Sequence, residues 1–212
     1  MPPSRTVVLN CAGIGSRLGL GRTKVLMELG GQSLLERHLR NFRHVRDLRI
    51  VVGFQSADVI AATLAIRRDV VFVYNHDYFT TGAGHSFWLG ARFGSDEVIQ
   101  WDGDLIIHPE DAARCLNHHG PFVGCSDRRS EDSVLCTLDA AGQVTGFSRE
   151  LGTAEWSGPC CMPRDAVCEN ADYVYTMLEK LLPLPSLRVR AMDIDTMSDY
   201  RKAEILLNEW ER

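Results

Sequence analysis

A glycine-rich turn that carries two cationic side chains is the part of the sequence best suited to chemistry. The turn follows an apolar run and contains Gly13 and Gly15, with Arg17 inside it and Lys24 shortly after it. Glycine lets backbone N–H groups point toward an anion, because no side chain stands in the way. Two cations beside such a turn suit a polyphosphate. The pattern therefore predicts a cradle for a nucleoside triphosphate.

Two acidic pairs stand at the ends of predicted strands. Asp102 and Asp104 follow a predicted strand at 98–101, and Asp193 and Asp195 close the last predicted strand. Ligands bind at the carboxyl ends of parallel strands, and Mg²⁺ takes one or two carboxylates together with phosphate oxygens. The alternative is a solvated turn, since Asp and Gly are common turn residues. Beside a cationic loop, the two pairs favour a magnesium–phosphate site.

Alternating strands and helices must position these groups. The first 117 residues predict strands at 6–9, 48–52, 70–74 and 98–101, and helices at 34–42 (capped by Ser33), at 59–66 (opened by Ser56 or Asp58), at 85–93 and from 109 or 110 to 115 or 116. Such β–α alternation is typical of a parallel sheet covered by helices on both faces.

The second half of the chain has a mixed pattern. It predicts short strands at 122–125, 134–138, 144–148 and 156–162, with a hairpin turn at 139–142, then a helix at 164–182, a loop at Pro183 and Pro185, a strand at 190–194 and a helix at 199–210 capped by Ser198. We therefore expect one α/β domain over residues 1–212, with a three-layer α/β/α, Rossmann-like, mostly parallel sheet. A small mixed β insertion is expected over the carboxyl edge of that sheet.

Four interpretations of the glycine-rich turn can be compared. A dinucleotide-binding turn requires G-x-G-x-x-G and a later acidic residue, but the third glycine is misplaced and the next strand ends in the non-acidic run 53–55. A Walker loop requires Gly-Lys-Ser/Thr, which is absent from the sequence. A plain turn does not require Arg17 and Lys24. The runs 13–18 and 23–26 instead resemble the G-x-G-(S/T)-R loop, with a following lysine, of nucleotidyltransferases.

More of the chain resembles the MobA-like nucleotidyltransferases. The similarity is closest to the small cytidylyltransferases that activate phosphocholine, aminoethylphosphonate or related phospho-alcohols. Residues 51–55 resemble the end of that family's second strand, residues 74–78 and 80–86 its base-recognition segment, and residues 155–158 its acceptor-side strand. The resemblance covers nearly the whole chain and implies a fold of the nucleotide-diphospho-sugar transferase type.

The resemblance also implies a set of site residues. Arg17, Lys24 and Asp104 would be catalytic, and Asp104 and Asp195 would bind Mg²⁺. The implied nucleotide-binding residues are Ala12, Gly13, Gly15, Ser16, Arg17, Gln55, Thr81, Gly82, Ser86 and Asp102. The implied acceptor-binding residues are Lys24, Glu155, Trp156 and Asp193. Trp156, Tyr173 and Tyr175 could form a cation–π cage for a quaternary amine, whereas core packing is the commoner use of such rings.

The implied reaction is the transfer of a nucleotidyl group, with CMP from CTP as the first expectation, to a small phosphorylated or phosphonate acceptor. The acceptor's phosphate would attack the α-phosphorus, and pyrophosphate would leave. Such a phosphate is largely ionised at neutral pH, because its second pKa is about 6, so no strong general base is needed. Alternatives are a sugar-1-phosphate transferase using UTP or GTP, a molybdopterin nucleotidyltransferase, or a non-catalytic nucleotide-binding module.

Composition limits the other classes of function. The net charge of −5 argues against nucleic-acid binding, which needs a basic face. No apolar run is long enough to span a membrane, and residues 1–5 carry no apolar signal region. The seven cysteines are odd in number and contain no C-x-x-C pair, which favours buried free thiols in a reducing cytoplasm. The expected partners are an NTP and a small acceptor, with a homodimer left open.

Overall fold

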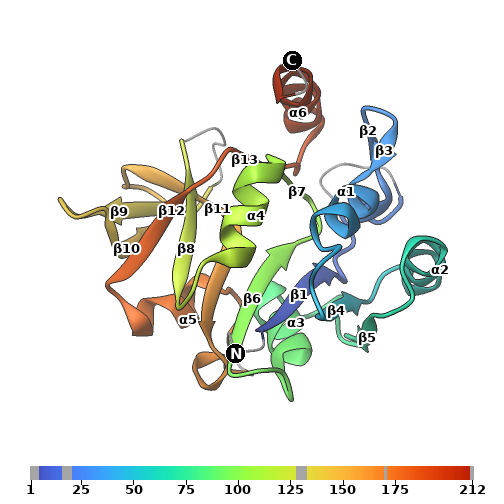
Figure 1. Ribbon diagram of the computed structural model, residues 1–212, viewed down its shortest axis with the longest axis horizontal. Coiled ribbons are helices and arrows are strands. Elements are labelled where there is room, and N and C mark those ends of the chain that lie inside the picture. The colour runs from blue at the N-terminus through green and yellow to red at the C-terminus, as the bar shows by residue number, and fades with distance from the viewer. Residues whose placement is uncertain (1–4, 16–20, 128–132, 170, 211–212) are drawn as a thin grey trace.

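A nine-stranded sheet forms the centre of the computed structural model (Figure 1), which describes residues 5–15, 21–127, 133–169 and 171–210. The sheet has the order β5-β4-β1-β6-β11-β8-β12-β10-β9. Its strands are β1 (Arg5–Cys11), β4 (Asp47–Val52), β5 (Val71–Tyr74), β6 (Glu97–Asp102), β8 (Phe122–Ser126), β9 (Leu135–Leu138), β10 (Gln143–Ser148), β11 (Ala154–Pro163) and β12 (Leu184–Arg188).

The first four strands of that order are parallel, and most of the remaining pairings are antiparallel. The mixed second half therefore continues the main sheet through β11, instead of standing apart from it. Two short ribbons lie outside the main sheet: β2 (Glu28–Leu29) pairs with β3 (Gln32–Ser33), and β7 (Leu105–Ile107) pairs with β13 (Ala191–Asp193).

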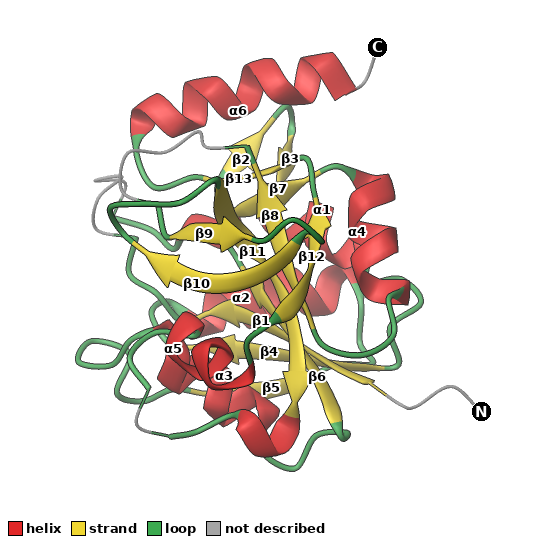
Figure 2. Cartoon of the chain, turned by 90° about the vertical axis from the view of Figure 1, so that its left-hand side faces the viewer, coloured by secondary structure: helices red, strands yellow, loops and turns green. Residues whose placement is uncertain are grey.

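Helices cover both faces of the sheet (Figure 2). The helices are α1 (Leu34–Asn41), α2 (Ser56–Ile66), α3 (Ala83–Ala91), α4 (Pro109–Asn117), α5 (Tyr175–Leu178) and α6 (Met197–Trp210), with 3₁₀ turns η2 (Lys24–Leu26), η3 (Arg164–Ala166) and η4 (Glu179–Leu181). Buried side chains of α1, α2 and α4 join one hydrophobic cluster, and those of α3 and α5 join another. The three-layer α/β/α class is confirmed.

Strand periodicity explains why the main sheet has one hydrophobic cluster on each face, whereas a third cluster packs α6 against the short ribbons. Along β1, Val7 and Leu9 belong to the first cluster, whereas Val8 belongs to the second. Successive side chains of a strand point to opposite faces of the sheet. The same rule separates Cys160 from Cys161 on β11, since Cys160 lies in the second cluster and Cys161 in the first. All seven cysteines are free and six are buried, as the sequence predicts.

The predicted helix at 164–182 is wrong. Across the described residues of this interval, the structure has only the turn η3, the four-residue helix α5 and the turn η4, followed by strand β12 where a loop was expected. The backbone here has partners outside its own segment, because the carbonyl of Asp172 accepts a hydrogen bond from the N–H of Gly84 at 3.0 Å. A side chain at Gly84 would approach the carbonyl oxygen of Ala171 to 2.1 Å. The close contact with α3 replaces helical pairing.

The predicted helix caps have mixed outcomes. Ser33 caps α1 in a capping box with Glu36, as predicted. The last helix begins two residues earlier than expected, because Thr196 and not Ser198 caps it. The hydroxyl of Thr196 accepts a bond from the N–H of Asp199 at 3.2 Å, and the carboxylate of Asp199 accepts one from the N–H of Thr196 at 3.0 Å. No helix within the described ranges is long and apolar enough to cross a membrane.

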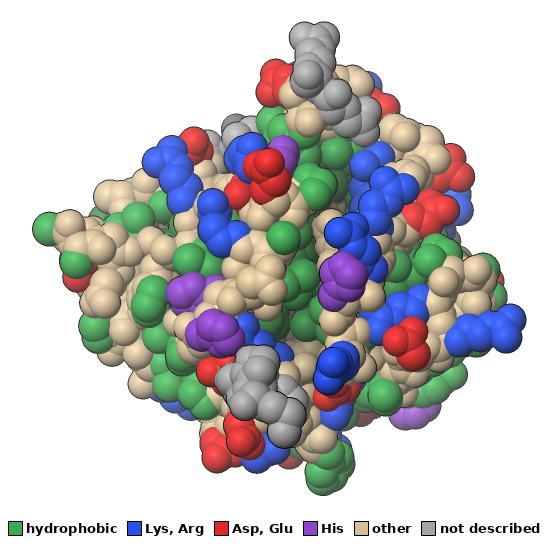
Figure 3. Space-filling view, in the orientation of Figure 1, with side chains coloured by type: hydrophobic (Ala, Val, Ile, Leu, Met, Phe, Trp, Pro, Cys, Tyr) green, Lys and Arg blue, Asp and Glu red, His purple; other side chains and the backbone are tan. Residues whose placement is uncertain are grey.

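Positive charge gathers on the face shown in Figure 3, along a groove between α1 and α4. The groove has a volume of about 840 Å³ and starts from Arg5 and Asp47, at the amino ends of β1 and β4. Its charged and imidazole side chains are Arg5, Arg40, Arg43, His44, Arg46, Asp47 and His119. The acidic motifs of the sequence lie at the opposite, carboxyl ends of the strands. The net negative charge of the chain is therefore unevenly distributed.

Candidate active site

A cavity of about 240 Å³ lies at the carboxyl ends of β1 and β6. The two strands are parallel neighbours, with Asn10 opposite Asp102, so the segments that follow β1 and β6 leave the sheet at the same point. The glycine-rich turn follows β1 and the Asp-Gly-Asp motif ends β6. The cavity is lined by Asn10, Cys11, Ala12, Gly13, Gly15, Thr23, Lys24, Val25, Tyr78, Thr81, Gly82, Ala83, Ser86, Asp102, Gly103 and Asp104.

Lys24 is the charged centre of this cavity. Its Nζ lies 2.8 Å from Oδ2 of Asp104 and 2.5 Å from Oδ1 of Asp195, and its side chain is only 13% exposed. Burial acts to lower the pKa of Lys24, but the charges and hydrogen bonds of the two carboxylates outweigh burial and raise the pKa above its ordinary value. The amine is therefore a firmly held cation, and residues distant in sequence converge on it.

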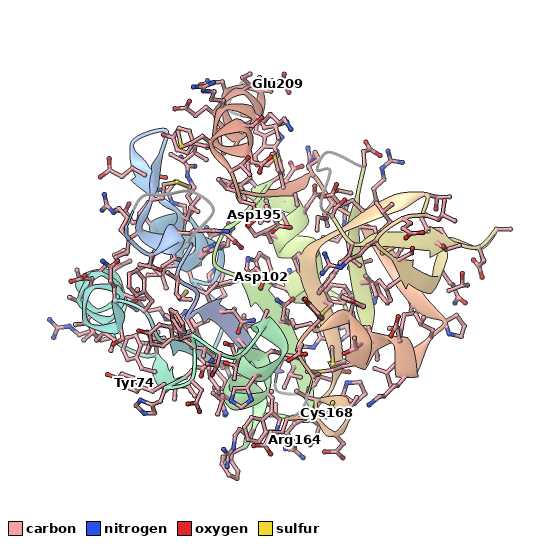
Figure 4. The ribbon with its side chains drawn as sticks, turned by 180° about the vertical axis from the view of Figure 1, so that it is seen from behind. Tyr74, Asp102, Arg164, Cys168, Asp195 and Glu209 are labelled. Atoms are coloured by element: carbon pink, nitrogen blue, oxygen red, sulfur yellow. The ribbon has the colours of Figure 1, made fainter. Side chains whose placement is uncertain are left out.

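Further carboxylates lie near this pair, and Figure 4 labels one of them, Asp102, below Asp195. Burial, and then the charge of Asp104, raise the pKa of Asp102 to about 6. Burial, followed by the charges of Asp104 and Asp102, raises the pKa of Asp193 well above its ordinary range. Glu155 and Asp195 also contribute to the shift at Asp193. The site therefore concentrates negative charge, which a cation can relieve.

We expect Asp102→Asn to stabilise the fold above pH 6. Because the folded-state pKa of Asp102 is above its unfolded value of 3.8, stability falls as the pH rises through the interval between 3.8 and about 6. Asparagine removes that loss, so the gain in free energy of unfolding should be on the order of 1–3 kcal/mol at pH 8. Urea unfolding at pH 4 and pH 8 checks this. A gain that is equal at the two pH values would contradict the assignment.

The donor set fits a divalent cation. Two carboxylates, from Asp104 and Asp195, already converge on one ammonium group. Mg²⁺ is commonly held by one or two carboxylates together with substrate phosphates and water. Among the described residues, no group of three or more Asp, Glu, His or Cys side chains forms a cage able to hold a metal ion by itself. The arrangement thus suits a metal that arrives with a polyphosphate.

A network around Asn75 organises the predicted base-recognition segment. The buried Asn75 donates from Nδ2 to Thr81 Oγ1 and to Ser86 Oγ, both at 3.0 Å. Its Oδ1 accepts from the N–H of Asp77 at 3.0 Å. Thr81, Gly82 and Ser86 line the cavity at the start of α3. Asn75 was absent from the sequence-predicted site, although it lies inside the segment that carries the resemblance.

Gln55 lies against the loop and not in the cavity. Its Oε1 accepts a bond from the N–H of Thr23 at 2.8 Å, and its Nε2 donates to the carbonyl of Gly21 at 3.2 Å. The backbone of Gln55 is in the left-handed region, with φ of 50°. In the structure, the side chain of Gln55 therefore holds the loop that leads to Lys24. The sequence analysis predicted that this side chain contacts the nucleotide.

Of the predicted acceptor residues, Lys24 lines the cavity, whereas Glu155, Trp156 and Asp193 are not among its lining residues. Glu155 is buried on β11, and the indole Nε1 of Trp156 donates to the carbonyl of Gly158 at 2.8 Å. The rings of Trp156 and Tyr175 have centroids 6.4 Å apart, and those of Tyr173 and Tyr175 are 5.5 Å apart. The structure brings the three aromatic residues together, but in mutual packing. Ser16 and Arg17 lie outside the described residues.

His38 is a neighbour of the acidic motif that the sequence did not single out. The imidazole Nε2 lies 3.1 Å from the carbonyl oxygen of Gly103, between Asp102 and Asp104. Burial lowers the pKa of His38 to about 4, against the opposing effects of the Gly103 bond and the Asp104 charge. The available signal was weak: His38 falls on the apolar face of α1 together with Leu34, Leu35 and Leu39.

The fold and the site define a class of protein. The strand ends carry a glycine-rich turn, a carboxylate-bound lysine and an Asp-Gly-Asp motif, and a family match over most of the chain places it in the class of the nucleotidyltransferases. The chain belongs to the family of the MobA-like NTP transferase domain, whose family model matches residues 7–155.

One curated relative is similar to about two thirds of the chain. The chain is 33% identical, over 167 residues, to the bifunctional IPC transferase and DIPP synthase of Rubrobacter xylanophilus. The matched region covers 71% of this chain and 38% of that protein. The chain therefore spans well under half the length of this relative.

Two solved structures share the fold. The CTP:phosphocholine cytidylyltransferase of Streptococcus pneumoniae has a TM-score of 0.78 at 16% identity, covering 96% of this chain and 99% of that one. The inositol-1-phosphate CTP transferase of T. maritima has a TM-score of 0.79 at 16% identity, covering 100% and 98% of the two chains. At these identities, the likeness shows the fold alone.

Proposed function

We propose that the chain transfers CMP from CTP to a small phosphorylated or phosphonate acceptor and releases pyrophosphate, with Mg²⁺ as cofactor. The observation that carries the proposal is the convergence of Asp104 and Asp195 on Lys24 beside the glycine-rich turn. A nucleotide-binding module has no need of such a paired cation at the point where a phosphate would react. The names of the two structural relatives support CTP and an alcohol phosphate as substrates.

Lys24 is the residue that would handle the reacting phosphates. Lys24 lines the cavity and is held by two carboxylates, so the amine stays protonated at neutral pH. In this position it would draw the α-phosphate and the acceptor phosphate together and offset their mutual repulsion. Asp104 and Asp195 would hold Mg²⁺, which would neutralise negative charge at the α-phosphate of the transferred cytidylyl group. Arg17 would bind the leaving phosphates.

The start of α3 would select the base. The Asn75 network fixes the hydroxyls of Thr81 and Ser86 at the cavity wall. A site that hydrogen-bonds a base edge rejects a base that leaves its polar groups unpaired. Discrimination against purine nucleotides should therefore be large.

We expect CTP with Mg²⁺ to raise the melting temperature more than UTP, GTP or ATP does, because only the preferred base forms hydrogen bonds with the polar groups of this cavity wall. Thermal unfolding with each of the four nucleotides at equal concentration measures the order. Ser86→Ala should reduce the CTP shift selectively, whereas Ser148→Ala, on β10 away from the cavity, should leave it unchanged. A larger shift with GTP or ATP would contradict the cytidylyl assignment.

The acceptor can be found by pyrophosphate release. The protein with Mg²⁺ and CTP is incubated with a panel containing phosphocholine, aminoethylphosphonate, inositol 1-phosphate and sugar 1-phosphates. Pyrophosphate formed only with an alcohol phosphate or a phosphonate supports the proposal. Turnover with a sugar 1-phosphate and UTP or GTP would favour the sugar-nucleotide alternative. Binding of nucleotide with no release across a wide panel would favour a non-catalytic module.

A further inference from the structure

The Asp-Gly-Asp motif is tied to three neighbouring elements. The N–H of Gly103 donates to the carbonyl of Asn10 on β1 at 3.0 Å. The carbonyl of Gly103 accepts from His38 on α1 at 3.1 Å, and the carbonyl of Asp104 accepts from the N–H of Ile194 at 3.0 Å. Ile194 stands between Asp193 and Asp195 in sequence. Of these three ties, only the one from His38 is made by a side chain.

The chemistry of the contact fixes the tautomer of His38. A carbonyl oxygen only accepts hydrogen bonds, so Nε2 must carry the hydrogen and donate it. Nδ1 is buried and has no hydrogen-bond partner within the described part of the chain. The neutral ring with hydrogen on Nε2 is therefore the form that the site requires.

Aromatic packing holds the imidazole ring in place. It is stacked on Phe42 with ring centroids 6.1 Å apart, and its edge meets Trp101 at 6.4 Å. Phe42 and Trp101 also contact one another at 5.0 Å. A buried polar group in such an apolar cluster costs free energy unless it forms a hydrogen bond. An apolar residue would pack here equally well, so the cluster alone does not explain a histidine.

We propose that His38 is a positioning residue, which fixes the direction of Asp104 by holding the carbonyl of Gly103. This carbonyl belongs to the peptide bond that joins Gly103 to Asp104, so its orientation sets where the Asp104 side chain leaves the backbone. Gly103 has no room for a side chain, because a Cβ there would approach the carbonyl oxygen of Asn10 to 2.7 Å, so the motif lies in close contact with β1 at this residue. Partners of this kind, which orient a ligand-bearing residue, typically change metal affinity or activity by about 10–100-fold. The inference rests on the proposed function for its kinetic consequence.

The test compares two substitutions at one position. His38→Gln keeps an N–H donor at similar reach, whereas His38→Leu keeps the apolar volume and removes the donor. We expect His38→Leu to lower kcat by about 10-fold or more and to raise the Mg²⁺ concentration for half-maximal rate, with little change in the KM for the nucleotide. His38→Gln should recover most of kcat. Phe42→Leu, which removes a ring of the same cluster without touching Gly103, is the matched control and should lower Tm while kcat is retained.

Two outcomes would overturn the proposal. In one, His38→Leu keeps kcat and Mg²⁺ dependence and only melts earlier, as Phe42→Leu does, which makes the residue structural. In the other, His38→Gln is as slow as His38→Leu, which removes the role of the donor.

A second readout separates this proposal from the proposed function. Nitrogen-15 NMR of the histidine ring in the wild-type protein should show the neutral form with hydrogen on Nε2. Observation of this form in a protein that transfers no nucleotide would leave the contact in place and remove the proposed function. Hydrogen on Nδ1 would overturn the contact itself, whatever the activity.

Discussion

Replacement of Asp104 by asparagine is expected to lower turnover by about 100-fold or more, and the same loss is expected for Asp195→Asn. Each change removes one of the two charges that meet at Lys24. Removing a single group that stabilises charge in the transition state typically costs a factor of about 10²–10³ in kcat. The volume of the side chain is nearly unchanged, so no cavity forms. Steady-state pyrophosphate release at saturating CTP and varied Mg²⁺ measures the effect.

A control variant should show that the loss of turnover requires removal of a carboxylate charge at the site and not elsewhere on the protein. Asp165→Asn is a suitable control, because Asp165 is 91% exposed and only weakly paired with Arg164. Its turnover and metal dependence should match those of the wild type. Chelation by EDTA should abolish the wild-type reaction, and addition of Mg²⁺ should restore it. Full activity in Asp104→Asn or in Asp195→Asn would remove the metal assignment.

Lys24→Met is expected to reduce turnover by about 100-fold or more and also to lower the melting temperature. The sequence alone places Lys24 shortly after the glycine-rich turn and gives no ion-pair partner for it. The structure places its ammonium between two carboxylates in a poorly exposed position. Loss of one partner from such a pair leaves uncompensated charge, which is strongly destabilising when the group is buried. Added Mg²⁺ should therefore restore the melting temperature of the variant by more than it raises that of the wild type.

Thermal unfolding and single-turnover kinetics, each measured with and without Mg²⁺, test the lysine prediction. Lys202→Met provides the control, since the half-exposed Lys202 lies on α6, reaches the buried Asp199 only at 3.7 Å and should change neither quantity. A Lys24→Met protein that melts early but transfers nucleotide at the normal rate would show a purely structural lysine. A normal Tm together with slow transfer would show that the acidic cluster does not need the amine for stability.

Local patterns predicted the fold where each element is shaped by its own residues. The buried runs of β1, β4 and β6 and the Ser33 cap of α1 were visible, because periodicity and capping act within a few residues. The interval 164–182 was misread as a helix, because its backbone bonds to α3, which is distant in sequence. Tertiary contacts of this kind leave no periodic signal.

The same contrast separates the parts of the site. Lys24, Asp104 and Asp195 could be named from a motif, and the structure brings them together. The roles of His38, Asn75 and Gln55 could not be derived, because each acts on backbone or hydroxyl groups whose proximity depends on the folded chain. A lone histidine among leucines has the pattern of an ordinary core position. Residues predicted to contact a ligand could be recognised from sequence motifs, whereas the residues that orient those side chains could not.

The adjacent thiols of β11 have a practical consequence for following the motions of this molecule. Cys160 and Cys161 lie in the two hydrophobic clusters on opposite sides of one sheet. Burial raises the pKa of Cys161 to about 12, and that of Cys160 well above its ordinary value, so neither thiol reacts while its cluster stays closed. Modification at each position, read by mass spectrometry, then reports separately on local opening of the helices that cover each face. The modification rates of two adjacent cysteines on one strand thus measure local opening on both faces of the sheet.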